Sequence, residues 1–176
     1  MNIKKLLHTE GIYRAFVLHL VNKTYAGITK PSVCAKKRKL LIKLGYEIGE
    51  DTTVLGPIEC SGKLTIGKNC WIGKNFKVNG NGSVTIGDNC DIGPEVTFQT
   101  GTHSIGTAER RAGEGASCNQ SVGDGTWIGV RTTVINNASI GKGCVIAAGA
   151  VVVGDIADNT LAGGVPAKTI RQIKDD

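Results

Sequence analysis

Aromatic residues are scarce in this chain of 176 residues, since Phe, Trp and Tyr together make up 5% of it. Proteins that bind nucleic acid commonly stack aromatic side chains on bases or carry a recognisable binding module, and neither feature is visible here. The net charge of +6 suits nucleic acid, but no other feature of the sequence favours such a partner, and we expect none. The charge also suits an acidic cofactor, an anionic membrane or a solvated face, and most of the excess lies in the N-terminal segment.

Nucleotide-binding signatures and long apolar runs are also missing. The sequence has no Walker A motif and no G-x-G-x-x-G after an expected strand, so nothing suggests ATP or NAD. The apolar positions of residues 1–24 are interrupted by Arg14 and His19, which leaves no run long enough to cross a bilayer. No small-residue cleavage site follows this segment, so it does not read as a signal peptide.

The chain does contain a repeat of six residues. Fifteen blocks open in phase between Ile48 and Val152, and thirteen of the opening residues are Ile or Val. Gly takes the second position in eight of these blocks, and the fifth residue is small throughout Val122–Val152. This period fits neither an amphipathic helix nor a single strand. We interpret each block as a short strand with a tight turn, three of which close one coil of a parallel β-helix around the opening and fifth residues.

The repeat divides the chain into a helical segment, an all-β solenoid of about five coils and a tail, at residues 1–46, 47–157 and 158–176. Two extra residues lie within Asn79–Val84, which predicts a small corner loop. Eighteen more lie between His103 and Val122, which predicts a long loop excursion over residues 104–121.

Two helices are expected before the solenoid. Residues 1–24 carry a one-sided apolar stripe, and a second helix starts near Ser32 and ends at Gly45. Two interpretations of the first helix stay open. Its stripe covers the open end of the solenoid or a neighbouring subunit, or the helix rests on a membrane surface as a basic amphipathic element.

Four of the six cysteines fall on inward positions of the repeat, because Cys60 opens a block and Cys70, Cys90 and Cys144 are fifth residues. Buried free cysteine behaves as a small hydrophobe, and the sequence contains no C-x-x-C pair. We therefore expect neither disulfides nor a metal site, and a reducing, cytoplasmic location. Cys118 is expected in the long loop, as a bystander.

His103 is the candidate catalytic residue. The other two histidines, His8 and His19, belong to the first helix and are expected to be surface or packing residues. His103 closes the block FQTGTH; Thr102 should face inward and His103 outward, at the root of the long loop. Loops on rigid scaffolds are where functional residues concentrate, and histidine exchanges protons near neutral pH.

These features together resemble the left-handed β-helix hexapeptide-repeat acyltransferases, in the maltose, galactoside and polysaccharide O-acetyltransferase branch, over roughly residues 48–173. The resemblance is carried by four stretches, which are Thr100–Gly113, Val122–Gly129, Ile140–Val152 and Ala162–Ile170. The left hand is taken from the resemblance, since parallel crossovers are otherwise right-handed. The implied function is acetyl-CoA-dependent O-acetylation of a sugar hydroxyl, without a metal, in bacterial surface polysaccharide or glycolipid precursor synthesis.

The resemblance also implies roles for individual residues. His103 acts as general base for direct transfer, and the backbone N–H of Val130 stabilises the oxyanion. Coenzyme A is held by the turns and the G-V-P-A-K tail, through Trp127, Gly129, Ala148, Gly149, Lys168 and Arg171. One departure is Val153-Gly154, where the family commonly has Thr-Lys.

Acceptor-binding residues are expected in both loops and on one outer face, namely Asn79, Asn81, Asp91 and Arg110. Arg110 follows Glu109 in a stretch that resembles the family's spacing of His and Arg. A carboxylate or a carbonyl is also expected to orient His103. The sequence leaves four carboxylates open, which are Asp88, Asp91, Glu95 and Asp124.

The repeat further predicts a homotrimer. Trp71, Asp91, Trp127 and Val145 should form one outward row, whereas His103 belongs to another side of the column. If Trp127 and His103 serve one site, a second subunit must supply one of them, as in the three-fold ring that the resemblance implies.

Other functions share parts of this pattern. A serine O-acetyltransferase shares the column and the histidine but usually carries a longer helical domain, and a streptogramin-type antibiotic acetyltransferase differs mainly in its loops. A γ-class carbonic anhydrase needs three histidines on zinc, which the coils do not have. A non-catalytic hexapeptide trimer scaffold would need neither the His103 loop nor the tail.

Overall fold

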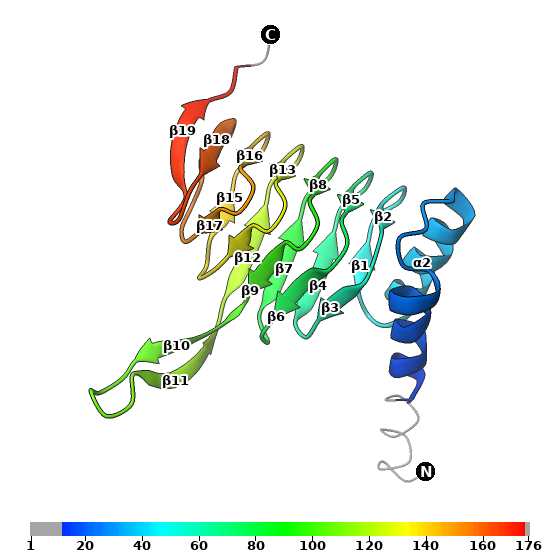
Figure 1. The fold of residues 1–176 in the computed structure, drawn as a ribbon, viewed down its shortest axis with the longest axis horizontal. Helices are drawn as coiled ribbons and strands as arrows, with labels where there is room; N and C mark the ends of the chain where they lie inside the picture. Colours follow the sequence, from blue (N-terminus) through cyan, green and yellow to red (C-terminus); the bar gives the residue numbers. More distant parts are fainter. Residues whose placement is uncertain (1–11, 175–176) are drawn as a thin grey trace.

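The computed structural model describes residues 12–174 as a triangular column of short parallel strands, with helices at one end and a projecting hairpin (Figure 1). Each coil passes through three sheets in turn. The expectations for residues 1–11, which include the start of the first helix and His8, lie outside the described residues.

Three parallel sheets form the sides of the column, and we number them in the order in which each coil visits them. The first sheet contains β1 (Glu47–Ile48), β4 (Lys63–Ile66), β7 (Ser83–Ile86), β12 (Asn119–Val122) and β15 (Ser139–Ile140). The second contains β2 (Thr53–Val54), β5 (Trp71–Ile72), β8 (Asp91–Ile92), β13 (Trp127–Ile128), β16 (Val145–Ile146), β18 (Thr160–Gly163) and β19 (Lys168–Gln172). The third contains β3 (Ile58–Cys60), β6 (Phe76–Asn79), β9 (Thr97–Gln99), β14 (Thr133–Val134) and β17 (Val151–Val152).

This architecture is the left-handed parallel β-helix expected from the sequence. Its interior follows the six-residue repeat, because fourteen of the fifteen opening residues are buried and only Cys60 is half-buried. The fifth residues are buried as well, except Thr102; among the buried ones are Thr126, Thr132 and Ala150. Stacked aliphatic side chains that leave water together supply the main driving force for such a column.

The column is longer than the five coils counted in the sequence. Ile156 forms a parallel bridge to Ile140, and β18 pairs in parallel with β16, so a sixth, partial coil follows five full ones. The parallel pairing therefore runs past residue 157. After it, the chain turns back and β19 adds an antiparallel strand to the edge of the second sheet.

The long insertion is a hairpin rather than a loop over residues 104–121. Strands β10 (Gly101–Ile105) and β11 (Ala112–Ser117) pair antiparallel, and β12 has already returned to the first sheet at Asn119. The expected inward direction of Thr102 was wrong: Thr100 is buried and Thr102 is exposed. Side chains alternate between the two faces of an extended backbone, so Phe98 and Thr100 face inward. The chain leaves the column directly after Thr100, and Thr102 therefore lies on the hairpin.

Cys118 also differs from its expected place in the loop. It is buried at the base of the hairpin, where its N–H donates to the carbonyl of Thr100 at 2.7 Å. A Cβ atom added to Gly82 would collide with the carbonyl of Cys118, so the short corner loop needs glycine there. All six cysteines are free thiols.

The first helix, over residues 12–19, continues as a π-helical turn, η1 (Leu20–Thr24), and α2 (Pro31–Lys43) follows. Val17 and Val21 pack against the column, and Asn22 exchanges two hydrogen bonds of 2.9 Å with the backbone of Ile58 in β3. The helices therefore cover the open edge of the first coil, which is one of the two roles expected for them.

Lys37 of α2 is fully buried, which is unusual for a lysine. Its Nζ donates to the carbonyls of Ile28 and Leu55, at 3.0 and 3.3 Å, and burial lowers the pKa of its ammonium group. The bond to Leu55 ties α2 to the turn after β2. No helix within residues 12–174 is long and apolar enough to cross a membrane.

Candidate active site

The hairpin β10–β11 carries His103 away from the column (Figure 1). His103 lies opposite Gly115 in the antiparallel register, and its side chain is exposed, as expected from the sequence. A Cβ atom on Gly115 would lie 4.0 Å from two atoms of the imidazole ring, in ordinary van der Waals contact, so the strand opposite does not cover the ring. The ring is therefore accessible to a substrate.

A hollow of about 490 Å³ lies around His103 at the root of the hairpin. Asn81, Gln99 and Thr102 line it together with His103, so the structure brings one of the two expected acceptor-binding asparagines beside the histidine. Asn79 lies elsewhere: it lines a hollow with Arg14 and Asn22, and its carbonyl accepts from Thr100.

A buried polar residue that the sequence analysis missed holds the base of the hairpin. Gln120 is 2% exposed, and its Nε2 approaches the carbonyls of Gln99, Val134 and Asn136 at 3.1, 3.2 and 2.9 Å. Its Oε1 accepts no hydrogen bond within the described residues. Gln120 is the register partner of Val84, which faces inward in the preceding coil. A polar residue at an inward position was the signal that could have identified it.

Replacing Gln120 by Met tests this tie, because Met keeps the length of the side chain and removes the donor. We expect a loss of about 1–3 kcal/mol in the free energy of unfolding, since buried carbonyls lose their partner. Amide hydrogen exchange in residues 101–117 should also become faster. If thermal unfolding and exchange both match the wild type, Gln120 does not hold the hairpin.

Turns between the first and second sheets are capped by aspartates of the following coil. Asp88 accepts the N–H of Lys68 at 2.8 Å, and Asp124 accepts the N–H of Asp88 at 3.0 Å. The N–H of Asp88, followed by the Lys142 ammonium group, holds the pKa of Asp124 below its usual range. These carboxylates therefore stabilise the column, and neither lines the hollow around His103.

The turns between the second and third sheets carry no such cap. Val130 and Ala148 occupy the corner position there, and within residues 12–174 neither backbone N–H donates a hydrogen bond. The two coils are joined at this edge by Gly149, whose N–H donates to the carbonyl of Val130 at 2.8 Å. Gly149 has φ +71°, which favours glycine. This edge therefore presents free donors beside small residues.

The outward row predicted for the second sheet is confirmed. Trp71, Asp91, Trp127 and Val145 are register partners in successive strands. Trp71, Asp91 and Trp127 line a hollow of about 390 Å³, and Trp127 is 57% exposed. Two large exposed indoles on one flat sheet face are typical of a surface that meets a ligand or another subunit.

The remaining candidate residues lie apart from these groups. Arg110 is at the tip of the hairpin, where its N–H donates to Thr107 at 3.2 Å. Lys168 and Arg171 are exposed on β19, beside the last coil. Glu95, a candidate to orient His103, pairs instead with Arg131 at 2.8 Å. No carboxylate lines the hollow around His103 within the described residues.

His103 and Val130 therefore lie on different edges of one column. The hairpin leaves between β9 of the third sheet and β12 of the first, whereas Val130 lies between β13 of the second sheet and β14 of the third. Neither Val130 nor Trp127 lines the hollow around His103. A site that uses both edges needs two copies of the chain.

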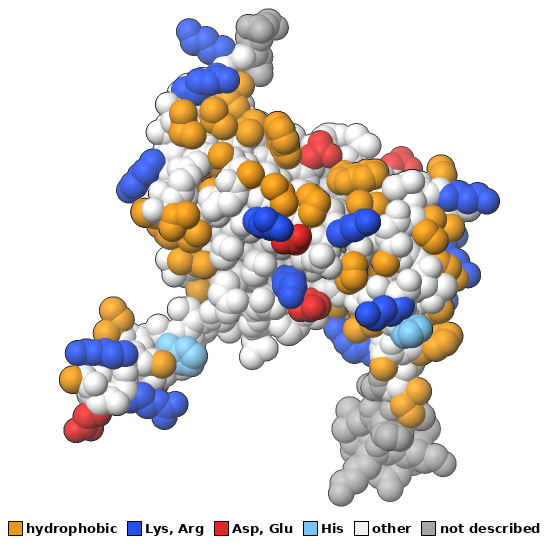
Figure 2. Space-filling view, viewed as in Figure 1, with side chains coloured by type: hydrophobic (Ala, Val, Ile, Leu, Met, Phe, Trp, Pro, Cys, Tyr) orange, Lys and Arg blue, Asp and Glu red, His pale blue; other side chains and the backbone are white. Residues whose placement is uncertain are grey.

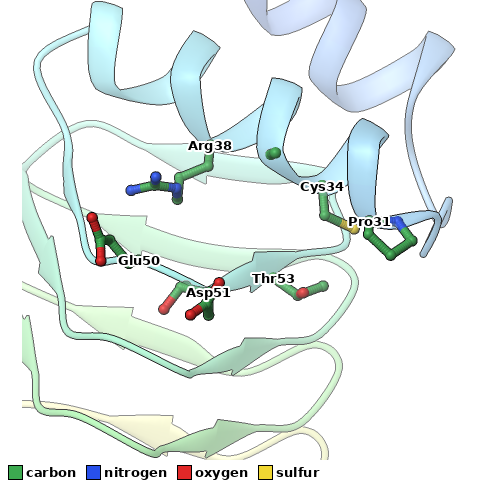
Figure 3. A pocket seen from close by; sticks show the side chains of 8 residues that line it. Pro31, Cys34, Arg38, Glu50, Asp51 and Thr53 are labelled. Carbon is green, nitrogen blue, oxygen red and sulfur yellow. The ribbon is translucent and has the colours of Figure 1, made fainter.

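Another hollow, of about 280 Å³, lies between α2 and the first coil (Figure 3). Figure 3 shows Arg38 of α2 extending toward the turn that carries Glu50 and Asp51. None of its lining residues is a histidine, and Arg38 is already engaged with the carbonyl of Ile48 at 3.1 Å. Within residues 12–174, no group of three His, Cys, Asp or Glu side chains is arranged to hold a metal ion.

Comparison with known families and proteins agrees with this geometry. Residues 121–154 match the family described as bacterial transferase hexapeptide (six repeats), and residues 63–96 match the hexapeptide repeat of succinyl-transferase. The galactoside O-acetyltransferase of Escherichia coli (strain K12) is 36% identical over 151 residues, which are 82% of this chain and 72% of that protein.

Solved structures are similar over nearly the whole chain. A hexapeptide-repeat-containing acetyltransferase of Vibrio cholerae, complexed with acetyl-coenzyme A, has a TM-score of 0.78 at 27% identity, covering 96% of this chain and 89% of that one. A galactoside acetyltransferase in complex with coenzyme A has a TM-score of 0.71 at 26% identity, covering 99% and 86%.

Proposed function

Because this chain belongs to the hexapeptide-repeat acetyltransferases of the galactoside O-acetyltransferase type, we propose that His103 drives acetyl transfer from acetyl-CoA to a sugar hydroxyl. The enzyme is an acetyl-CoA-dependent O-acetyltransferase. The observation that carries the proposed mechanism is the exposed imidazole at the root of the hairpin, in a hollow lined by polar side chains.

Acyl transfer needs a base and an oxyanion donor, because a thioester is already an activated acyl group. His103 takes the proton of the acceptor hydroxyl while the hydroxyl oxygen forms a bond to the acyl carbon. The N–H of Val130 donates to the oxygen that becomes negative. The bond between the acyl carbon and sulfur then breaks, and His103 gives its proton to the departing sulfur. The acetyl group thus moves directly to the acceptor, and the enzyme is left unmodified.

The edge at Val130 fits the elongated arm of coenzyme A. Its corner residues, Gly129, Val130, Ala148 and Gly149, are small or apolar and leave two N–H groups free within the described residues. Trp127 lies on the adjoining face. Lys168 and Arg171, exposed on β19 beside the last coil, are suitable partners for the nucleotide phosphates. They also compensate for the missing Thr-Lys at Val153-Gly154.

A three-fold ring of parallel columns brings the two edges together. In such a ring, the hairpin of one subunit faces the Val130 edge of its neighbour, and three equal sites form in the grooves between columns. The exposed row on the second sheet supports this arrangement, because the indoles of Trp71 and Trp127 offer apolar surface to a second copy.

The acceptor is proposed to lie between the hairpin and the neighbouring column. Asn81 offers amide donors and acceptors inside the hollow with His103, and Arg110 extends the site along the hairpin. Asp91 adds a carboxylate from the row on the second sheet. A polar, open site of this kind suits a sugar in surface polysaccharide or glycolipid precursor synthesis. Six free thiols and the use of acetyl-CoA favour the cytoplasm as its location.

Release of coenzyme A with a panel of acceptors tests this function. We expect thiol release from acetyl-CoA with at least one hexoside or oligosaccharide, at a rate well above hydrolysis, and none with serine. The acetyl ester on the sugar should be detected by mass spectrometry. Turnover with serine alone, or with no hydroxyl acceptor at all, would contradict the proposed acceptor class.

A further inference from the structure

The charges of the chain are segregated between the helices and the column. Residues 12–45, here called the cap, contain eight Lys and Arg and no Asp or Glu. Residues 46–176 contain eleven basic and fourteen acidic residues. The whole positive excess of the protein therefore comes from the N-terminal end, although the column contains the proposed active site.

Most cations of the cap face solvent, although Lys37 is buried. Five of the eight are exposed, namely Lys23, Lys30, Lys36, Lys39 and Lys43. The three ion pairs found within residues 12–174 all lie on the column. In Figure 2, several Lys and Arg side chains lie at the helical end, and basic side chains lie beside acidic ones over the middle. Further basic side chains lie on the hairpin and at the C-terminal end.

Large apolar side chains are exposed on the same two helices. Ile12, Tyr13 and Phe16 are 57%, 45% and 59% exposed on the first helix, while Val17 on its other face is buried against the column. Ile42 of α2 is also exposed, next to Lys43. The helix thus presents one apolar face to the column and a second one to the outside.

We propose that the cap binds the surface of an anionic lipid bilayer. Exposed lysines are attracted to the negative surface potential, and the exposed apolar side chains of the same helices enter the boundary between headgroups and acyl chains. An acidic polysaccharide would satisfy the charges but leave Ile12 and Phe16 in water. A second copy of the chain would cover the apolar residues but would oppose lysines with lysines.

The proposed trimer strengthens this contact, and this step rests on the proposed function. A three-fold axis along parallel columns places all three caps at the same end of the assembly. Three weak contacts that act together bind much more tightly than one. The enzyme would then sit on the membrane by its helical end, with its sites close to acceptors that are attached to lipids.

Co-sedimentation of the full chain with vesicles tests the proposal. We expect binding to vesicles of phosphatidylglycerol and phosphatidylcholine, weakened by salt, and no binding to phosphatidylcholine alone. Each lysine near such a surface contributes about fivefold in partitioning, so replacing three by Gln should weaken binding about a hundredfold. The three are Lys36, Lys39 and Lys43. The Phe16→Ser variant should also weaken binding and leave the oligomeric state unchanged.

The matched control replaces three exposed lysines outside the cap by Gln, namely Lys63, Lys68 and Lys174, and should bind as the wild type does. Equal binding to neutral vesicles, or a cap variant that binds as well as this control, would overturn the proposal. So would dissociation of the trimer by Phe16→Ser, because the apolar face would then be a subunit contact. Acetylation of a soluble sugar is expected to be unchanged in the cap variants.

Discussion

His103→Ala is expected to lower kcat by about a thousandfold while leaving the protein folded and able to bind coenzyme A. General base catalysis by a positioned histidine contributes about 10²–10⁴ in rate, and no carboxylate lines the hollow to replace it within the described residues. Because the side chain is exposed on the hairpin, its removal should change the free energy of unfolding by less than about 0.5 kcal/mol.

The measurements are steady-state release of coenzyme A, coenzyme A binding by calorimetry and thermal unfolding. His19→Ala is the matched control, since His19 is an exposed histidine on the first helix, away from the proposed site. It should keep full activity. Turnover of the His103→Ala variant within tenfold of the wild type would remove His103 from the mechanism.

Val130→Pro is expected to lower kcat by about 10²–10³, because proline removes the one backbone N–H that is proposed to stabilise the oxyanion. The column should tolerate this change. Pro94 already occupies the same corner one coil earlier. The nitrogen of Pro94 stacks over Gly73 in the same way as the nitrogen of Val130 stacks over Gly93. Val130→Ala removes the side chain but keeps the N–H, and should retain most of the activity.

Loss of activity in both Val130 variants would point to the side chain instead of the N–H.

Mixing two inactive variants tests whether the site is shared. Trimers assembled at random from His103→Ala and Val130→Pro subunits should regain about a quarter of the wild-type activity, because one site in four then combines an intact histidine with an intact N–H. A mixture as inactive as its components would place each site within one chain.

The interior of the column could be predicted from spacing alone. A side chain at a block opening, such as Ile128 or Val134, must be apolar because three sheets close around it and leave no water. The same spacing predicted the row of Trp71, Asp91 and Trp127, because equal steps of six residues bring equivalent positions into register. The excess of glycine in second positions follows from how closely successive coils stack.

The hairpin could not be predicted in the same way. Its starting point depends on hydrogen bonds between residues far apart in sequence, such as Thr100 with Cys118 and Gln120 with Gln99. The repeat therefore misjudged the direction of Thr102 and placed Cys118 in a loop. The partial sixth coil was missed because β18 follows a gap in the six-residue phase and is recognised only by its pairing with β16.

The sequence by itself determined which residues face the inside of the column, since a strict period leaves each side chain one direction. It also singled out His103, because a polar residue at the break of that period has no packing role. Only the tertiary structure decided which edge each candidate residue occupies, and that His103 and Val130 lie on different ones. The physical reason is that edges arise from the closing of coils, through backbone hydrogen bonds that connect residues about eighteen or more positions apart and leave no local pattern.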